Sequence, residues 1–504
     1  MLPDFMIFEK DTCTGVFFVL KIVRIRGKGT EMTQKILVGG EWRTTNEILE
    51  VRFPYDGSLI DSVYMAQEQD LEDAIVVAQR GFKISRSLPS YKRTEILQNL
   101  YRLMGEHFDD FVELMILEGG KNRKTAVGEM KRALQTILVS AEEARRIQGD
   151  VFDIDWTPAG ENRKGFTQHV PIGIVLAITP FNYPINLACH KIGPAIAVGN
   201  AIILKPAEKT PLSSVLLAEL VLEAGYPPEA FSMVNCWGQL AQKMVSDNRI
   251  AMLSFTGSAS VGWMLKGLAG RKKVVLELGG NAGVIVHEDA DISLAVRETS
   301  TGGFANAGQN CISVQRLLVH EPVYDEFIQS FVQAVQQMKV GDPREADTDV
   351  GPLITEKDAL RAAKWIEEAE AAGAKIICGG HRDSTLLWPT VLTDTSADMK
   401  VRCEEAFAPI LTISSYHDWD EAIDTINDSP YGLQAGLFTN DMNRIMDAWK
   451  RIEVGGLQVN SASTFRVDHM PYGGVKASGF GREGVKYSIE EMTELRLMVL
   501  NMNK

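Results

Sequence analysis

The stretch of sequence that decides the fold is GIVLAITPFNYPINLACHKIGPAIAVGNAIILKPAEKTP, residues 173–211. It contains two short apolar runs, GIVLAIT and AIILK, and a polar loop that contains proline follows each run. Apolar residues after each loop recur at helical spacing. Short buried strands that alternate with helices predict βαβ units and a parallel sheet. Because ligands bind beyond the carboxyl ends of such strands, we expect the loops PFNYP and KPAEK at a binding edge.

The alternation of strands and helices continues along the chain. FSMVN, IAMLSF and KVVLEL are expected strands, and TGSAS opens a helix between the last two. A second alternation begins at NAGVIVH and includes QRLLVHE and a helix around Phe327 to Met338. These patterns predict an α/β protein with a doubly wound parallel sheet and another α/β domain.

Three further segments have clear local signals. Residues 70–145 show helical spacing of apolar side chains, and these helices are expected to cover one face of a sheet. In a later helix, Thr210 is the expected cap and Pro211 suits the first turn. VFDIDW and KGFTQHV flank the turn TPAGENR and predict a protruding hairpin, which is a common form of oligomer arm.

Composition narrows the class of protein. A chain of 504 residues with 45% hydrophobic and 23% charged residues is an ordinary globular protein of roughly two to four domains. A formal net charge of −14 argues against a nucleic-acid partner, which usually requires a basic face. The cysteines form no CxxC pair, so we expect no metal site and no disulfide framework but reduced thiols in a cytoplasmic protein. The six cysteines are Cys13, Cys189, Cys236, Cys311, Cys378 and Cys403.

The N-terminal region contains a short apolar run, VFFVLKIVRI, at residues 16–25. It is about half as long as a spanning helix, so we expect no membrane segment. Acidic residues precede it where a signal peptide would be basic. We therefore expect residues 1–31 to be a non-native or disordered extension, with the real start at Met32.

Three segments suggest chemistry from their own residues. Cys311 lies in GFANAGQNCIS, a polar, glycine-rich stretch that favours exposure, and a cysteine thiolate is a strong nucleophile near neutral pH. Glu277 ends an expected strand and precedes two glycines, which can bring a carboxylate and backbone to a cleft. FTGSASVG, residues 255–262, opens a helix whose N-terminal amides suit an anion. Each segment by itself is more often structural than functional.

Seven segments taken in order resemble the aldehyde dehydrogenase superfamily, from about residue 32 to the end of the chain. The resemblance implies an α/β fold with a Rossmann-type cofactor domain, an α/β catalytic domain and a β-hairpin oligomerisation arm. The implied cofactor domain is residues 32–145 and 169–275, the arm is 146–168 and 486–504, and the catalytic domain is 276–485. The seven segments are ITPFNYP, KPAEKTP, FTGSASVG, ELGGN, GQNC, EEAFAP and MPYGGVKASGFGREG.

The resemblance implies the roles of three residues. Cys311 is the expected nucleophile, and its thiolate attacks the aldehyde carbon. Asn182 and the Cys311 backbone N–H are the expected donors to the resulting oxyanion, where one lost donor costs about 2.7 to 4 kcal/mol. Hydride transfer to NAD(P) leaves a thioester, and Glu277 activates the water that hydrolyses it, a role that favours a raised carboxylate pKa.

The resemblance also implies a set of residues around a nicotinamide dinucleotide. A carboxylate at Glu208 accepts hydrogen bonds from ribose hydroxyls and repels a 2′-phosphate, so NAD is favoured; Lys205 and Lys209 leave NADP possible. The turn after FSMVN departs from the family pattern, because NCWGQLA offers only Gly238. The implied cofactor residues are Ile178, Thr179, Pro180, Phe181, Lys205, Pro206, Glu208, Gly238, Phe255, Thr256, Gly257, Ser258, Val261, Leu278, Gly279, Glu405 and Phe407.

The substrate is expected to be a small, polar aldehyde. STFRVDHMPYGGVK, GREGVKYSIEEM and GQNCISV are most similar to the branch with lactaldehyde and non-phosphorylating glyceraldehyde-3-phosphate dehydrogenases. Tyr183, Arg132, Asn310 and Arg466 are the implied substrate residues, since phosphate-using relatives keep arginines near Arg132 and Arg466. Asn310 stands where those relatives often have arginine, which argues against a phosphorylated substrate. Salt bridges are the alternative role for both arginines.

Two other functions remain as alternatives. A CoA-acylating semialdehyde dehydrogenase would share the fold and the nucleophile, but such enzymes commonly lack the hydrolytic glutamate that Glu277 supplies. A catalytically inactive structural or binding relative would be expected to lose Cys311, Glu277 or Asn182, and all three are present. The expected partners are the aldehyde and further copies of the chain in a dimer or tetramer, with no nucleic acid, membrane or metal.

Overall fold

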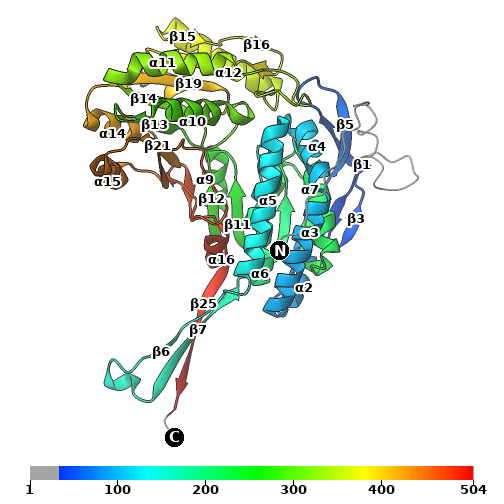
Figure 1. Cartoon of the computed structure of the whole chain (residues 1–504). Helices are drawn as coiled ribbons and strands as arrows, with labels where there is room; N and C mark the ends of the chain where they lie inside the picture. Colours follow the sequence, from blue (N-terminus) through cyan, green and yellow to red (C-terminus); the bar gives the residue numbers. More distant parts are fainter. Residues whose placement is uncertain (1–32, 503–504) are drawn as a thin grey trace, which may run out of the picture.

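The computed structural model describes residues 33–502, so the expected extension at residues 1–31 lies outside the described part of the chain. Two large sheets with helices on their faces form the body, and a three-stranded sheet projects from it (Figure 1). No helix within residues 33–502 combines the length and apolar character needed to cross a membrane.

The first sheet has eight strands in the order β24-β12-β11-β8-β9-β10-β2-β3. Its five central strands are parallel, as the alternation predicted, and the outer pairings are antiparallel. Every residue of β8 and β9 is buried, which is typical of a parallel strand covered on both faces. The strands are β2 (Ile36–Val38), β3 (Glu41–Arg43), β8 (Ile174–Ile178), β9 (Ala201–Lys205), β10 (Phe231–Met233), β11 (Ile250–Thr256), β12 (Lys273–Glu277) and β24 (Gly479–Phe480).

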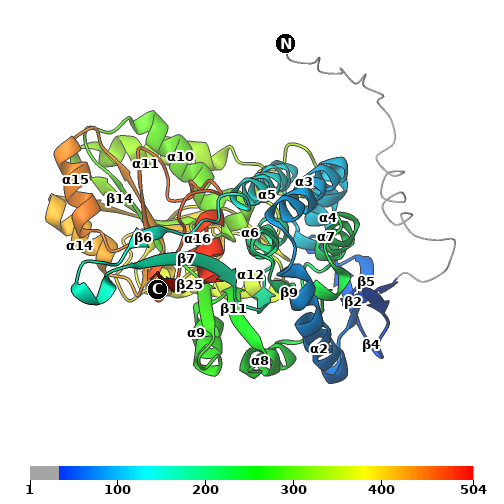
Figure 2. The same ribbon diagram turned by 90° about the horizontal axis from the view of Figure 1, so that it is seen from below.

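Helices cover both faces of this sheet. α6 and α7 pack on one face, and α2, α8 and α9 pack on the other (Figure 2). The helices predicted over residues 70–145 are present, and α5 lies over α6. The helices are α2 (Glu68–Ser85), α3 (Ser90–Glu106), α4 (Phe108–Gly119), α5 (Arg123–Glu143), α6 (Pro184–Val198), α7 (Leu212–Glu223), α8 (Gly238–Ser246) and α9 (Ala259–Leu268).

The expected cap of α7 is wrong. Thr210 Oγ1 has no hydrogen-bond partner within residues 33–502, and Pro211 is the N-cap residue itself, outside the first turn. Instead, the buried carboxylate of Glu118 on α4 accepts hydrogen bonds from the backbone N–H of Leu212 at 2.6 Å and of Ser213 at 3.0 Å. The first backbone amides of α7 are therefore capped by a carboxylate from α4 and not by the Thr210 side chain, which the local sequence predicted as the cap.

The start of α6 is held in the same way from α5. Glu129 Oε1 accepts hydrogen bonds from the backbone N–H of Ile185 at 2.9 Å and of Asn186 at 3.1 Å. The buried Lys121 ammonium pairs with the other oxygen of Glu129. α6 and α7 follow the loops after β8 and β9. Carboxylates from α5 and α4 therefore accept hydrogen bonds from the first backbone amides of these two helices.

The second sheet has seven strands in the order β15-β18-β19-β14-β13-β21-β22, and all its pairings except β15 with β18 are parallel. Val284 and Val286 on β13 face one apolar core while Ile285 faces another, so both faces are covered. The predicted second alternation is therefore present. Its strands are β13 (Ala282–Val286), β14 (Val314–His320), β15 (Lys375–Cys378), β18 (Thr390–Thr393), β19 (Ile410–Tyr416), β21 (Gln434–Phe438) and β22 (Gly456–Val459).

The helices of the second unit pack on the two faces of the seven-stranded sheet, and each face has its own apolar core. Residues of α10, α11 and α12 join the larger core, and residues of α14 and α15 join the smaller core. These helices are α10 (Ile292–Phe304), α11 (Glu321–Gln336), α12 (Glu356–Ala371), α14 (Trp419–Asn427) and α15 (Met442–Arg451). The division expected between residues 275 and 276 falls inside β12, because that strand runs on to Glu277 before the chain crosses to the second unit.

The projecting sheet consists of β6 (Val151–Asp153), β7 (Arg163–Pro171) and β25 (Thr493–Asn501), all antiparallel. Figure 2 shows β7 and β25 side by side beneath α16. The predicted hairpin is therefore present, and the C-terminal strand completes it. The boundary at residue 486 is wrong, since α16 (Val485–Glu491) occupies that stretch and the strand begins only at Thr493.

Candidate active site

A cleft of about 810 Å³ lies between the two units and takes residues from both. It collects loops that follow β8, β11 and β12 on one side and the loop before β14 on the other. Close approach of these loops requires glycine, because a Cβ on Gly280 would lie 2.3 Å from the carbonyl oxygen of Cys311. The expected site residues that line it are Arg132, Pro180, Phe181, Asn182, Tyr183, Thr256, Gly257, Ser258, Glu277, Leu278, Gly279, Asn310, Cys311, Glu405, Phe407 and Arg466.

Cys311 is half-buried on the wall of this cleft. Its sulfur lies 3.2 Å from the hydroxyl of Tyr472 and 3.8 Å from Oδ1 of Asn310. Burial raises the pKa of the Cys311 thiol to about 11, while the hydrogen bond from Tyr472 and the charge of Arg466 act in the opposite direction. The thiol is therefore less exposed than its polar surroundings in the sequence suggested.

Asn182 lies beside the loop that carries the cysteine. Its side-chain Nδ2 donates to the carbonyl of Gln309 at 3.1 Å, and Asn306 Nδ2 donates back to the Asn182 carbonyl at 3.4 Å. Asn306 and Ala307 have φ values of 53° and 55°, in the left-handed region that non-glycine residues rarely adopt. The loop before Cys311 is thus held in a strained conformation next to an amide donor.

Glu277 lies at the end of β12 and is only 3% exposed. Neither of its carboxylate oxygens has a hydrogen-bond partner among the described residues. Burial raises its pKa well above the usual range, and the nearby charge of Glu483 acts in the same direction. A buried carboxylate without partners next to a nucleophile is an unusual arrangement in a purely structural site.

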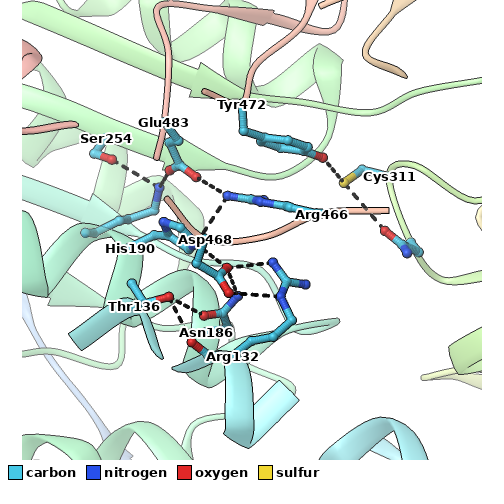
Figure 3. A network of polar contacts seen from close by, with 12 residues as sticks. Arg132, Thr136, Asn186, His190, Ser254, Cys311, Arg466, Asp468, Tyr472 and Glu483 are labelled. Atoms are coloured by element: carbon cyan, nitrogen blue, oxygen red, sulfur yellow. Dashed lines mark hydrogen bonds and ion pairs between the residues drawn. The ribbon is translucent and has the colours of Figure 1, made fainter. Parts of the chain in front are cut away.

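A network of buried charges supports the wall behind Cys311 (Figure 3). Lys191 on α6 pairs with Glu483 at 2.8 Å and donates to Ser254 at 3.0 Å. Arg466 lies 3.5 Å from the second oxygen of Glu483 and 3.3 Å from Nε2 of His190. These side chains hold Arg466 rigidly in the wall of the cleft.

A second part of this network surrounds Asp468. The carboxylate accepts hydrogen bonds from Arg132 at 2.7 Å and Asn186 at 3.1 Å and lies 2.9 Å from His190 Nε2. The pKa of Asp468 is lowered by these partners against the effect of burial. Arg132 and Arg466 therefore both make the salt bridges considered for them, and both also line the cleft.

The other end of the cleft has features that fit a dinucleotide. Ser258 precedes α9 but makes no side-chain cap, so the amides at the start of this ten-residue helix remain available to an anion. Thr256 Oγ1 is buried and has no hydrogen-bond partner in the part of the chain that the structure describes. Glu405 accepts from the Gly280 N–H at 3.0 Å, and burial raises its pKa to about 7.

An aromatic pair and a close contact between two loops lie at the same end of the cleft. Phe181 and Phe407 meet edge to face at 5.8 Å between ring centres. A Cβ on Gly279 would lie 2.1 Å from the Glu405 carboxylate, so a larger residue here would displace that carboxylate. The residues present therefore suit a flat ring and a pyrophosphate.

Several expected cofactor residues lie next to the cleft but do not line it. Lys205 ends β9 and pairs with Glu208 at 2.6 Å. Gly238 is the first residue of α8 and does not form a family-type turn facing the cleft. The expected residues outside the lining are Ile178, Thr179, Lys205, Pro206, Glu208, Gly238, Phe255 and Val261.

The residues that the sequence reasoning missed are Tyr472, Lys191, Glu483, His190 and Asp468. Tyr472 and Glu483 lay within a segment that was recognised as a motif, but no role was assigned to them. Lys191 carried the clearest signal, since it is a charged residue in α6, a helix whose residues are all buried. Buried charges of this kind require partners from elsewhere in the fold.

Comparison with known proteins decides the family. The Aldehyde dehydrogenase family matches residues 42–498 of this chain. The chain belongs to the aldehyde dehydrogenase family. It is 46% identical over 468 residues to a 3-sulfolactaldehyde dehydrogenase of Priestia megaterium, a match that covers 93% of this chain and 98% of that protein.

Solved structures of aldehyde dehydrogenases agree with this assignment. Aldehyde dehydrogenase 21 from Physcomitrella patens, in complex with the reaction product succinate, matches with a TM-score of 0.92 and 38% identity over 94% of this chain and 99% of that one. Glyceraldehyde-3-phosphate dehydrogenase GapN from Methanocaldococcus jannaschii, complexed with NADP, matches with a TM-score of 0.87 and 37% identity over 91% and 100% of the chains. The predicted fold class and branch of the family are confirmed.

The aldehyde dehydrogenase assignment makes this chain an oxidoreductase that converts small, polar aldehydes to acids with a nicotinamide cofactor. The CoA-acylating and inactive alternatives are not favoured. The relatives are dehydrogenases of small aldehydes, and Cys311, Glu277 and Asn182 line one cleft.

Proposed function

We propose that this aldehyde dehydrogenase oxidises a small hydroxyaldehyde that carries an anionic group, of the type of 3-sulfolactaldehyde. The proposal is carried by one observation: the cleft that contains Cys311, Glu277 and Asn182 also has Arg132 and Arg466 in its wall. The 46% identity to a 3-sulfolactaldehyde dehydrogenase supports it.

The charges around the cleft favour a monoanion. Lys191, Arg132 and Arg466 face the two ionised carboxylates of Asp468 and Glu483, whose pKa values are both lowered. The raised pKa of the buried Glu277 favours its neutral form. Within this group of five residues the positive charges exceed the negative ones, and an anionic substrate restores the balance.

The positions of two hydrogen-bond donors support formation of an acyl thioester on Cys311. Its thiolate attacks the aldehyde carbon, and the negative charge moves to the aldehyde oxygen. Asn182 Nδ2 and the Cys311 N–H donate to that oxygen, which requires the amide to leave the Gln309 carbonyl that it contacts at 3.1 Å. The nicotinamide cofactor, when bound, would supply the hydride acceptor, and loss of hydride from the tetrahedral carbon would leave an acyl thioester on Cys311.

Hydrolysis of the thioester is the role of Glu277. The carboxylate takes a proton from a water molecule, the water oxygen attacks the thioester carbon, and the Cys311 thiolate leaves as the acid forms. Burial raises the pKa of Glu277, so its ionised form is a stronger base than a solvated carboxylate. The lack of other hydrogen-bond partners leaves both oxygens available to water.

The eight-stranded sheet unit would hold the cofactor. Phe181 and Phe407 would flank the nicotinamide ring, Glu405 would accept from its ribose, and the α9 amides would bind the pyrophosphate. We favour NAD over NADP because Glu208, paired with Lys205, would accept the adenosine ribose hydroxyls and repel a 2′-phosphate. The Methanocaldococcus neighbour was crystallised with NADP, so both cofactors belong in every assay.

Steady-state kinetics with a panel of aldehydes tests the proposed substrate. We expect kcat/KM for 3-sulfolactaldehyde to exceed that for lactaldehyde, succinic semialdehyde and glyceraldehyde-3-phosphate, each measured with NAD and with NADP. Arg132→Gln should raise KM for the sulfonate far more than for lactaldehyde. Equal kcat/KM for charged and uncharged aldehydes would contradict the proposed anion preference.

A further inference from the structure

The hydroxyl of Tyr472 lies closer to the sulfur of Cys311 than ordinary packing requires. The distance is 3.2 Å, and the tyrosine is 4% exposed (Figure 3). Sulfur hydrogen bonds are usually longer than oxygen ones, so this contact is a close one. Tyr472 precedes Gly473 in a loop that comes from the C-terminal third of the chain, far from Cys311 in sequence.

The other polar groups near the sulfur cannot take the place of this hydroxyl. Asn310 Oδ1, 3.8 Å from the sulfur, is an acceptor and interacts with the protonated thiol. Asn182 Nδ2 donates to the Gln309 carbonyl. Within residues 33–502, Tyr472 is thus the side chain positioned to donate an O–H to a Cys311 thiolate.

Arg466 holds the tyrosine ring in place. Its guanidinium carbon lies 3.6 Å from the centre of the Tyr472 ring, and the carboxylate of Glu483 lies 3.5 Å from the same guanidinium. A cation on the ring face fixes the ring plane and adds positive potential beside the sulfur. Ring and hydroxyl therefore have a single orientation toward Cys311.

The protonation states agree with this geometry. Burial raises the pKa of the Tyr472 phenol well above its ordinary value, so the hydroxyl keeps its proton at every working pH. Burial also raises the pKa of the Cys311 thiol to about 11, and the hydrogen bond from Tyr472 is the first influence that lowers it. The phenol therefore stays protonated and can donate a hydrogen bond to the Cys311 thiolate, whose formation burial disfavours.

We propose that the Tyr472 hydroxyl donates a hydrogen bond to the Cys311 thiolate and sets how much thiolate exists before the aldehyde arrives. The proposal rests on the proposed role of Cys311 as nucleophile. When the sulfur bonds to carbon, its charge passes to the aldehyde oxygen beside Asn182, and the phenol no longer has an anion to stabilise. Tyr472 therefore stabilises the Cys311 thiolate of the free enzyme and does not stabilise the oxyanion that forms after attack.

The test is the pH profile of alkylation in Tyr472→Phe, which removes one oxygen and keeps the ring. Cofactor-free full-length protein is treated with iodoacetamide, and modification of the Cys311 peptide is followed by mass spectrometry, which separates it from the other cysteines. We expect the apparent pKa of Cys311 to rise by about one to two units, because hydrogen bonds to charged groups are among the stronger ones. At neutral pH the alkylation rate should fall roughly ten- to a hundredfold.

Tyr416→Phe is the matched control, because it removes another buried phenol, whose hydroxyl contacts His287 at 2.7 Å in the second unit. Its Cys311 profile should equal that of the unmodified enzyme. Tyr472→Met, which also lacks the hydroxyl, should reproduce the shift seen with Tyr472→Phe. An unchanged or lowered apparent pKa in either Tyr472 variant would overturn the proposal.

The alkylation readout needs no aldehyde turnover, so it is independent of the proposed function. Full dehydrogenase activity in Cys311→Ser would refute the proposed function even if the pKa shift of Tyr472→Phe were found. Conversely, an inactive Cys311→Ser with an unshifted Tyr472→Phe profile would refute only the role of Tyr472.

Discussion

Glu277 is the residue whose substitution separates the two halves of the proposed reaction. Glu277→Gln removes the base but leaves Cys311 and Asn182, so acyl transfer should proceed and hydrolysis should stall. We expect a burst of about one reduced cofactor per subunit and then a steady-state rate about 10² to 10⁴ lower. Rapid-mixing absorbance of the reduced cofactor measures both phases. A full steady-state rate in this variant would remove Glu277 from the mechanism.

The raised pKa of Glu277 also predicts a pH dependence of turnover. Its folded-state pKa lies above the ordinary value, so the ionised base appears only as the pH rises through that higher pKa. Where hydrolysis limits turnover, kcat should therefore increase as the pH is raised above the range in which an ordinary carboxylate ionises. The remaining steady-state rate of Glu277→Gln should lack this rise. A flat profile in the unmodified enzyme would show that another step limits kcat.

Glu208 is the residue that tests cofactor choice. Glu208→Gln removes a negative charge beside Lys205, and the loss of repulsion should favour a 2′-phosphate. We expect the ratio of kcat/KM for NAD to that for NADP to fall by about tenfold, which corresponds to about 1.4 kcal/mol. Glu223→Gln at the exposed end of α7 removes the same charge elsewhere and should leave the ratio unchanged.

Residue by residue, the sequence allowed prediction of the groups that sit in recognisable motifs. Cys311, Glu277 and Asn182 line one cleft, as expected. Lys191, His190 and Asp468 escaped prediction because their partners lie on other elements, and pairing between distant charges leaves no local pattern. Tyr472 escaped for the same reason, since its contact with Cys311 spans 161 positions of the chain.

Among the helices, α6 illustrates how a remote element positions the site. Its N-terminal amides bind Glu129 of α5, and the Asn182 loop leads directly into it. Glu129→Ala should destabilise the fold by about 3 to 5 kcal/mol, because it leaves the buried Lys121 charge without its partner. Denaturant unfolding followed by circular dichroism measures this loss.

A double variant separates the two contributions of Glu129. In Glu129→Gln with Lys121→Met, no lone charge remains and an amide oxygen is still available to the α6 amides. This double variant should be more stable than Glu129→Ala. If both lost the same stability, neither the unpaired Lys121 charge nor the missing cap oxygen would account for the loss in Glu129→Ala.

Elements were predicted best where periodicity is strong. The strands GIVLAIT and AIILK became β8 and β9, and the helical region before residue 145 became four helices. Predictions failed at element ends: Thr210 lost its expected cap role to Glu118, and α16 occupies the expected start of the C-terminal strand. Tertiary contacts decide such ends, and the local sequence does not record them.

For the whole molecule, the projecting sheet predicts self-association. Leu495, Leu497 and Val499 alternate along one face of β25 and are 58%, 56% and 42% exposed. Apolar residues in such a row favour contact with a second copy, so Leu495→Glu with Leu497→Glu should lower the mass of the particle. Size-exclusion chromatography with light scattering measures that mass.

The control for the arm is Leu360→Glu on α12, a leucine that is 49% exposed and far from β25 in sequence. It introduces one glutamate at an exposed leucine outside the arm and should leave the mass unchanged. An unaltered mass in the β25 double variant would place the association surface elsewhere on the molecule.

β24 has a consequence for synthesis of the chain on the ribosome. Gly479–Phe480 pairs with the outer edge of β12, whose residues precede it by some two hundred positions. Until residue 480 has emerged, the nascent first unit carries an open apolar strand edge. Such an edge recruits other unfinished chains, so chaperone occupancy should persist until β24 has emerged. The residues of β24, which complete the sheet, therefore also end the period in which the nascent chain is most prone to aggregate.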